Sequence, residues 1–195
     1  MSNLSSSAVA PGQTLNIFCP DTLGGVLPLT GASGSVRFLP LTSALSDAGV
    51  RLTATATGGA MGVARTAGTS LTLLGEATSA SAKTDKALWV TNLPDTYATG
   101  AKIVVNAYAA ILGTGTLTAA SCTLTCAAYS EVNGVEAALT VSAAATIVAA
   151  GAVYPFTITG TGLVSGNTVA IELVGLVTSS SGANTLEIGS ISFTA

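Results

Sequence analysis

The chain contains no histidine among its 195 residues, and this absence excludes several kinds of active site. Without an imidazole, the protein cannot build a Ser-His-Asp or Cys-His catalytic arrangement, a histidine general base or a histidine metal ligand. The nine carboxylates form no recognisable catalytic motif. Most hydrolases are therefore excluded, and we expect a protein that is not an enzyme and needs no cofactor.

The carboxylates are expected on the solvated surface, because acidic side chains are rarely buried unless they are paired. Glu172 and Glu187 are predicted to be neighbours on the outer face of adjacent strands. Calcium bound between Asp85 and Asp95 is an alternative, but acids are far sparser in this segment than in a dedicated calcium loop. The sequence therefore predicts no metal site.

Charge is scarce throughout the chain. Only 8% of the residues are charged, 49% are hydrophobic, and the net charge is −3. The six cations are scattered, whereas nucleic-acid binding needs clustered cations, so we expect no direct contact with nucleic acid. Ordinary globular proteins have about 25% charged residues. So few charges leave apolar and hydroxyl side chains on the surface, which favours burial against other protein subunits.

Long uninterrupted apolar segments are missing as well. The first ten residues lack the basic start and the continuous apolar run of a secretory signal. Residues 137–171 carry no charge, but glycines and Pro155 interrupt them, and they are rich in threonine, serine and alanine. We interpret this segment as strands and turns rather than as a transmembrane helix, and we expect no membrane partner.

Cysteine is limited to Cys19, Cys122 and Cys126. If Cys122 and Cys126 lie in one strand, they share a face but stand about 13 Å apart, at about 3.3 Å per residue, and cannot form a disulfide with each other. We interpret the cysteines as small buried residues of a protein in a reducing compartment. A disulfide from Cys19 to either of the others, or a thiolate metal site, is the alternative.

From residue 50 onward, short β-rich segments alternate with clusters of glycine, asparagine, aspartate and serine. This spacing is typical of a β-sandwich or barrel. The predicted strands are Val50–Thr57, Ser70–Leu74, Ala87–Thr91, Lys102–Ala109, Ser121–Tyr129, Glu136–Val141, Tyr154–Thr159, Thr168–Val174 and Thr185–Phe193. At most one short helix is expected, where alanine accumulates at residues 143–150. The sequence therefore predicts an all-β chain.

Alternation of apolar and other residues is clearest near the C-terminus. Val169, Ile171 and Leu173 are predicted to face the core, because alternate residues of a strand share one face. The preceding strand, Tyr154–Thr159, is joined to this one by the glycine-rich residues 160–167. Such a segment is typical of a turn, so the two strands are predicted to be antiparallel neighbours.

The last predicted strand changes phase. Leu186 and Ile188 share one parity, whereas Ile191 and Phe193 have the other. A β-bulge inserts one extra residue and restores the buried face after such a change. We therefore predict a bulge near Gly189 and Ser190.

The first 48 residues differ in composition from the rest of the chain. Four of the six prolines lie there, at Pro11, Pro20, Pro28 and Pro40. We predict that residues 1–48 form an extended N-terminal arm with short strands, which covers its own core or reaches a neighbouring subunit or a host surface. Residues 49–195 are predicted to form an antiparallel, jelly-roll-like β-sandwich.

Aromatic residues are few, at 5% of the chain. Trp89 lies just before a Pro-Asp turn that ends at Tyr97, and Tyr108 lies in the next predicted strand. Packing in the core or in a turn is the usual role of single aromatics in a sandwich. Contact with a sugar is the alternative, and its candidate ligand-contact residues are Trp89, Tyr97 and Tyr108.

The segment YPFTITGTGLVSGNTVAIELV (Tyr154–Val174), followed by LEIGSISF (Leu186–Phe193), resembles the closing strands of jelly-roll domains in virion proteins of tailed bacteriophages. With residues 87–97 and 102–109 included, the resemblance extends over about the last half of the chain. It implies a capsid decoration or cement protein that is made in the host cytoplasm and becomes part of the virion, on the capsid surface.

The same resemblance implies the partners of the chain. Proteins of this group commonly form homotrimers that bind the major capsid protein. Two other functions remain open: a carbohydrate-binding or adhesion β-sandwich module, and a jelly-roll capsid protein that forms the shell itself.

Overall fold

The structure is a computed structural model of the chain. It describes residues 15–17, 27–29, 36–65, 71–78, 81–117, 122–132, 135–148 and 150–195. The chain divides into two compact units, Met1–Ser33 and Gly34–Ala195. In the first unit, β1 (Leu15–Ile17) and β2 (Leu27–Leu29) pair antiparallel.

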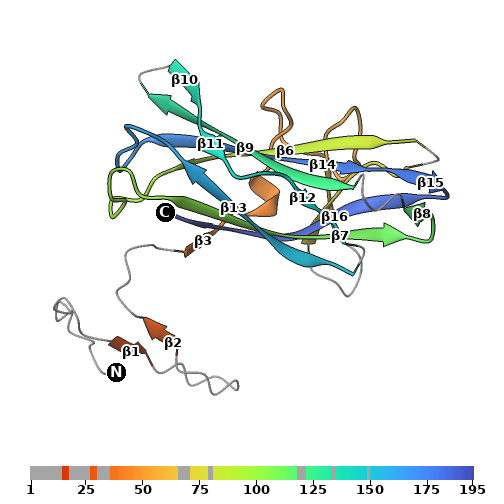
Figure 1. The fold of residues 1–195 in the computed structure, drawn as a ribbon, viewed down its shortest axis with the longest axis horizontal. Coiled ribbons are helices and arrows are strands. Elements are labelled where there is room, and N and C mark those ends of the chain that lie inside the picture. Colours follow the sequence, from red (N-terminus) through yellow and green to blue (C-terminus); the bar gives the residue numbers. More distant parts are fainter. Residues whose placement is uncertain are drawn as a thin grey trace. The chain divides into compact units, whose positions relative to one another are not determined.

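The second unit consists of antiparallel sheets packed against each other, which confirms the predicted all-β sandwich (Figure 1). The larger sheet has seven strands and the facing sheet has five. Among the described residues the only helical element is a short 3-10 turn, η1 (Leu41–Ser43). None of the described residues belongs to a helix long and apolar enough to cross a membrane.

Each sheet is built from strands that are distant in sequence. The five-stranded sheet has the order β10 (Val135–Ala138), β9 (Thr123–Val132), β14 (Thr168–Val177), β6 (Lys83–Asn92), and β12 (Ala145–Thr146) also pairs with β9. The seven-stranded sheet has the order β11 (Thr140–Val141), β13 (Ala152–Thr159), β7 (Ile103–Gly113), β16 (Asn184–Thr194), β5 (Leu71–Leu74), β4 (Gly62–Arg65), and β3 (Val36–Phe38) also pairs with β16. A small pair of strands, β8 (Thr116–Leu117) and β15 (Ser179–Ser181), lies outside both.

Most of the predicted strands coincide with observed strands, but two predictions are wrong. Residues 50–57 form a loop with isolated bridges at Arg51 and Thr57. This segment is rich in threonine, but most of it is exposed, so little burial favours a regular strand. Glu136–Val141 is not one strand: the chain leaves the five-stranded sheet after β10 and enters the other sheet as β11.

The core lies between the two sheets, and alternation identified its residues correctly. Val169, Ile171 and Leu173 of β14 are buried, and Phe156 and Ile158 of β13 face them from the other sheet. The predicted pairing of these two strands is wrong, because β13 pairs with β7 and β11 whereas β14 pairs with β9 and β6. Residues 160–167 thus connect the two sheets instead of closing a hairpin.

The predicted bulge in the last strand is confirmed. The register between β16 and β7 shifts between Ile188 and Ser190. Ile188 and Ile191 are both buried as a result, although their parity differs.

The second unit includes residues 36–48, which were predicted to belong to the N-terminal arm. Leu39, Leu41 and Ala44 are part of the hydrophobic core. This segment is also joined to β16, because the backbone N–H of Leu39 donates to the carbonyl oxygen of Ile191 at 3.0 Å.

Candidate functional site

Two of the three aromatic candidates belong to the core. Trp89 is 1% exposed, and its Nε1–H donates to the carbonyl oxygen of Pro40 at 3.1 Å. Tyr97 is 5% exposed, and its hydroxyl donates to the carbonyl oxygen of Ala101 at 2.6 Å. The fold itself uses both their rings and their polar groups, so neither side chain is presented to a sugar.

Tyr108 is the candidate that reaches the surface. It is half-buried on the outer side of β7, opposite Ser190 and Val153 in the register. Its ring lies over Gly189, where an added Cβ would stand 2.9 Å from Tyr108 Cδ1, and its hydroxyl lies against Gly151. Contact of Tyr108 with a ligand stays a prediction.

On the outer side of the seven-stranded sheet, three neighbouring rows that begin at Tyr108 carry no charge. Alternate residues of β13, β7 and β16 point outward there and form three cross-strand rows. The rows are Val153, Tyr108 and Ser190; Pro155, Asn106 and Ser192; and Thr157, Val104 and Thr194. We call this surface the uncharged face.

The residues of the uncharged face are all exposed or half-buried, with Val153 60% exposed. The residues between them, such as Val105, Ala107 and Phe193, are fully buried. Glu187 lies beyond the face on β16, and Lys102 precedes β7. A sheet that faces water on one side ordinarily alternates apolar with strongly polar residues. On the uncharged face, the outward side chains carry a hydroxyl or an amide group or are apolar.

Sequence reasoning missed this surface, although a signal for it is present. Ile103–Gly113 and Ala152–Thr159 contain no charged residue, and Asn184–Thr194 contains only Glu187. Finding the face also requires knowing that β13, β7 and β16 are neighbours, which chain order does not reveal.

A hollow of about 490 Å³ lies beside the loop of residues 45–61. Four threonines, glycine backbone and Lys86 contribute to its lining. Lys86 Nζ stands 3.3 Å from Asp47 Oδ2 of the loop and 3.5 Å from Glu172 Oε1 of β14. The charge of Lys86 is thus already neutralised by two carboxylates, and these ion pairs hold the loop to the sheet.

The electrostatics of this cluster reflect its burial. Burial raises the pKa of Glu172, and the nearby Lys86 offsets only part of that effect. Burial alone would lower the pKa of Lys86, but its hydrogen bond to Asp47 and the charge of Glu172 raise it overall. The prediction that Glu172 and Glu187 are surface neighbours is wrong, because β14 and β16 belong to different sheets and Glu172 is covered.

Asp85 is a second carboxylate that sequence reasoning wrongly placed on the surface. It is 3% exposed, and its Oδ2 accepts the backbone N–H of Glu76 at 3.0 Å. Its Oδ1 has no hydrogen-bond partner among the described residues. Burial raises the pKa of Asp85. The adjacent Lys83 forms its ion pair with Glu76, at 2.7 Å. Within the described ranges, no group of three or more acidic or cysteine side chains is placed to hold a metal ion.

Cys126 of β9 and Cys122, the residue just before this strand, are both buried. Burial raises the pKa of Cys126 to about 12, with the charge of Glu172 as a smaller cause. At neutral pH this thiol is protonated, so it is neither a nucleophile nor a thiolate ligand. Cys19 lies outside the described residues, and the alternatives that involve it stay predictions.

Comparison of the chain with protein-family models and with curated proteins gives no match. The functional argument therefore depends on the surfaces of the sandwich itself. Among the sites described above, the hollow is lined by a loop that ion pairs hold to the sheet, and Asp85 is buried within the fold. The uncharged face is the candidate that is open to another molecule.

Proposed function

We propose that the protein is a virion structural component, a capsid decoration or cement protein that acts as a homotrimer and binds the major capsid protein at the head surface. The uncharged face is the observation that carries this proposal. It presents three strands of hydroxyl, amide and apolar side chains with no charge among them.

The physical argument concerns the cost of removing water. Burying a charge without a partner is far more costly than burying a hydroxyl or an aliphatic group, and the centres of stable interfaces are depleted in charge. Val153 and Pro155 supply exposed apolar area, and Tyr108 adds an aromatic side chain held over two glycines. Such a surface can be covered by another protein without leaving a charge unpaired.

The same observations bear on the alternative of a sugar-binding module. A sugar site of the predicted kind requires exposed aromatic rings for stacking, and Trp89 and Tyr97 are core residues. Tyr108 alone remains, in contact with Gly189 and Gly151. The arrangement therefore favours a protein partner over a glycan.

Attachment to capsids tests the proposal. Particles that lack this protein, made from the genome that encodes it, are mixed with the purified chain and sedimented. We expect the wild-type protein to sediment with them, and Val153→Lys with Thr157→Lys to reduce binding at least about tenfold, because two charges are then desolvated at the interface.

The matched control places the same two charges on the other sheet, as Thr84→Lys with Val90→Lys on the outer side of β6. This variant should bind as the wild type does. Failure of the wild-type chain to bind, or equal binding of all three proteins, would contradict the proposal. Closed particles formed by the purified chain alone would instead identify a shell-forming protein.

A further inference from the structure

One end of the five-stranded sheet carries two like charges directly opposite each other. Glu131 at the end of β9 pairs in register with Glu136 of β10, and both side chains are exposed. Like charges directly opposite on neighbouring strands are destabilising. Figure 1 shows this end of β9 and β10 projecting past the other strands.

The next register pair adds apolar surface to the same place. Val132 of β9 lies opposite Val135 of β10, and these side chains are 40% and 66% exposed. Because successive residues of a strand point to opposite faces, the valines lie on one face and the carboxylates on the other. We call Glu131, Val132, Val135 and Glu136 the β9–β10 tip.

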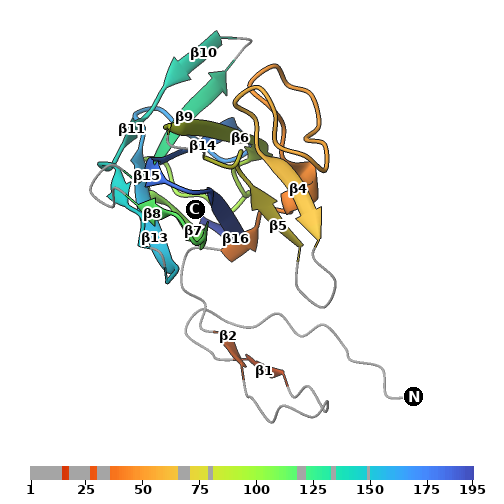
Figure 2. The same cartoon turned by 90° about the vertical axis from the view of Figure 1, so that its right-hand side faces the viewer.

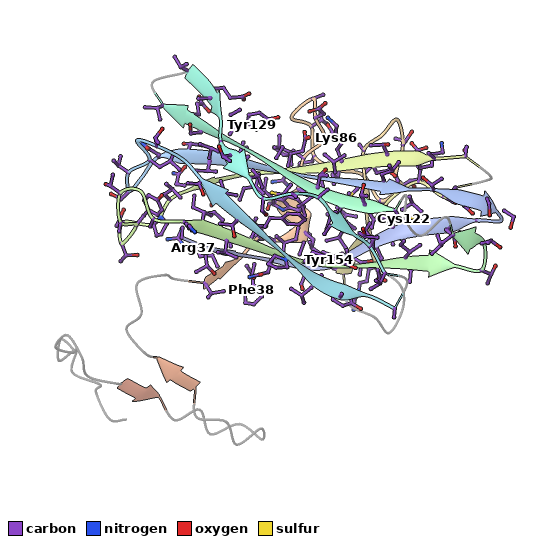
Figure 3. All side chains as sticks on the ribbon, viewed as in Figure 1. Arg37, Phe38, Lys86, Cys122, Tyr129 and Tyr154 are labelled. Atoms are coloured by element: carbon purple, nitrogen blue, oxygen red, sulfur yellow. The ribbon has the colours of Figure 1, made fainter. Side chains whose placement is uncertain are left out.

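A complementary group of residues lies on β3. Val36 is 60% exposed and Phe38 is 73% exposed, and Arg37 between them is also exposed (Figure 3). Ion pairs among the described residues involve only Lys83 and Lys86 as cations, so Arg37 has no carboxylate partner there. We call Val36, Arg37 and Phe38 the β3 edge.

The β9–β10 tip and the β3 edge cannot contact each other within one molecule. β10 belongs to the five-stranded sheet, and β3 pairs with β16 of the facing sheet. Both views place β10 on the opposite side of the sandwich from β16 (Figures 1 and 2). In the described part of the chain, β10 pairs only with β9 and β3 only with β16, so each strand keeps an open backbone edge.

We propose that the β9–β10 tip of one copy docks on the β3 edge of a second copy. The acidic pair then meets Arg37, and the exposed valines meet Val36 and Phe38. Charge complementarity selects a second copy as the partner, since the chain carries both halves of the contact. A contact between two different surfaces is heterologous, and it closes into a ring if the rotation between copies allows it. The inference deepens the proposed function by naming the contact through which copies associate.

Charge reversal tests this contact. The mass of the full chain is measured by light scattering over a wide concentration range, for the wild type, for Arg37→Glu, for Glu131→Arg with Glu136→Arg, and for all three changes together. We expect the wild type to reach a multiple of 18.9 kDa. Either partial set should weaken association at least about tenfold, because it places like charges at the contact. The combined variant should restore association.

The controls are Arg65→Glu and Asp95→Lys, which reverse exposed charges outside the contact. Thermal unfolding verifies that each variant is folded. A monomeric wild type, or association that charge reversal leaves unchanged, would overturn the inference. Capsid attachment of the Lys variants on the uncharged face is measured separately. A chain that binds capsids as a monomer would therefore refute this contact and the proposed homotrimer, and would leave capsid binding through the uncharged face standing.

Discussion

Single residues show where sequence reasoning about charge succeeds and where it fails. Glu131 and Glu136 are exposed, as expected of acidic residues, but Asp85 and Glu172 are buried. Alternation correctly places Glu172 on the outer side of β14, yet the loop that carries Asp47 covers it. Parity in a strand reveals the direction of a side chain, and it does not reveal what distant segment lies over that side chain.

Asp85 gives a pH-dependent prediction. Burial raises its pKa in the folded protein above the ordinary value of 3.8, so the folded state binds the proton more tightly than the unfolded state does. The wild type therefore loses stability as the pH rises from the unfolded pKa through the folded pKa. We expect Asp85→Asn to remove this loss. The unfolding free energy of the variant should therefore rise relative to that of the wild type when the pH is raised from 4 to 7.

Denaturant unfolding of both proteins at the two pH values measures this effect. Asp95→Asn, at an exposed turn position, is the control for loss of a carboxylate. The interpretation of Asp85 would be wrong if the difference in unfolding free energy between Asp85→Asn and the wild type were the same at both pH values.

Elements show how much of the fold could be predicted. The buried face of β14 and the bulge in β16 follow from alternation, which is a local property. The strands that pair with β13 and β14 cannot be predicted from alternation. Residues 160–167 have the composition of a turn whether they close a hairpin or cross between sheets. The uncharged face depends on these partners, so it could not be located from the sequence.

The loop of residues 45–61 is an element held by its contacts to β6 and β14. Backbone hydrogen bonds join Leu45 to Leu88 and Gly59 to Lys86, and the Lys86 side chain binds Asp47 and Glu172. We expect Lys86→Met to destabilise the protein by about 1 kcal/mol at pH 7, because Glu172 is then buried beside no cation. At a pH well below 4.5, the ordinary pKa of a glutamate, the loss should shrink as Glu172 becomes protonated in both states.

Unfolding free energies at pH 7 and at acidic pH distinguish this ion-pair effect from a loss of packing. Lys102→Met removes an exposed cation and serves as the control. A loss that is equally large at both pH values would show that Lys86 acts through its aliphatic stem rather than through its charge.

At the scale of the whole molecule, the scarcity of charge has a spatial pattern. In the described part of the chain, most charges lie around the loop beside β6, at the β9–β10 tip and at the β3 edge. The three rows of the uncharged face carry none, and Glu187 and Lys102 lie just beyond them. The composition alone predicted burial against another protein. We propose that the uncharged face is the surface that is buried.

Hydroxyl-radical footprinting of the capsid-bound and free protein tests this central claim most directly. We expect Tyr108, Val153 and Pro155 to be oxidised several-fold less in the bound protein, because a partner then covers the uncharged face. Tyr129, on the outer side of the other sheet, should be oxidised equally in both states. Equal oxidation of Tyr108 and Val153 in the bound and free protein would contradict the account.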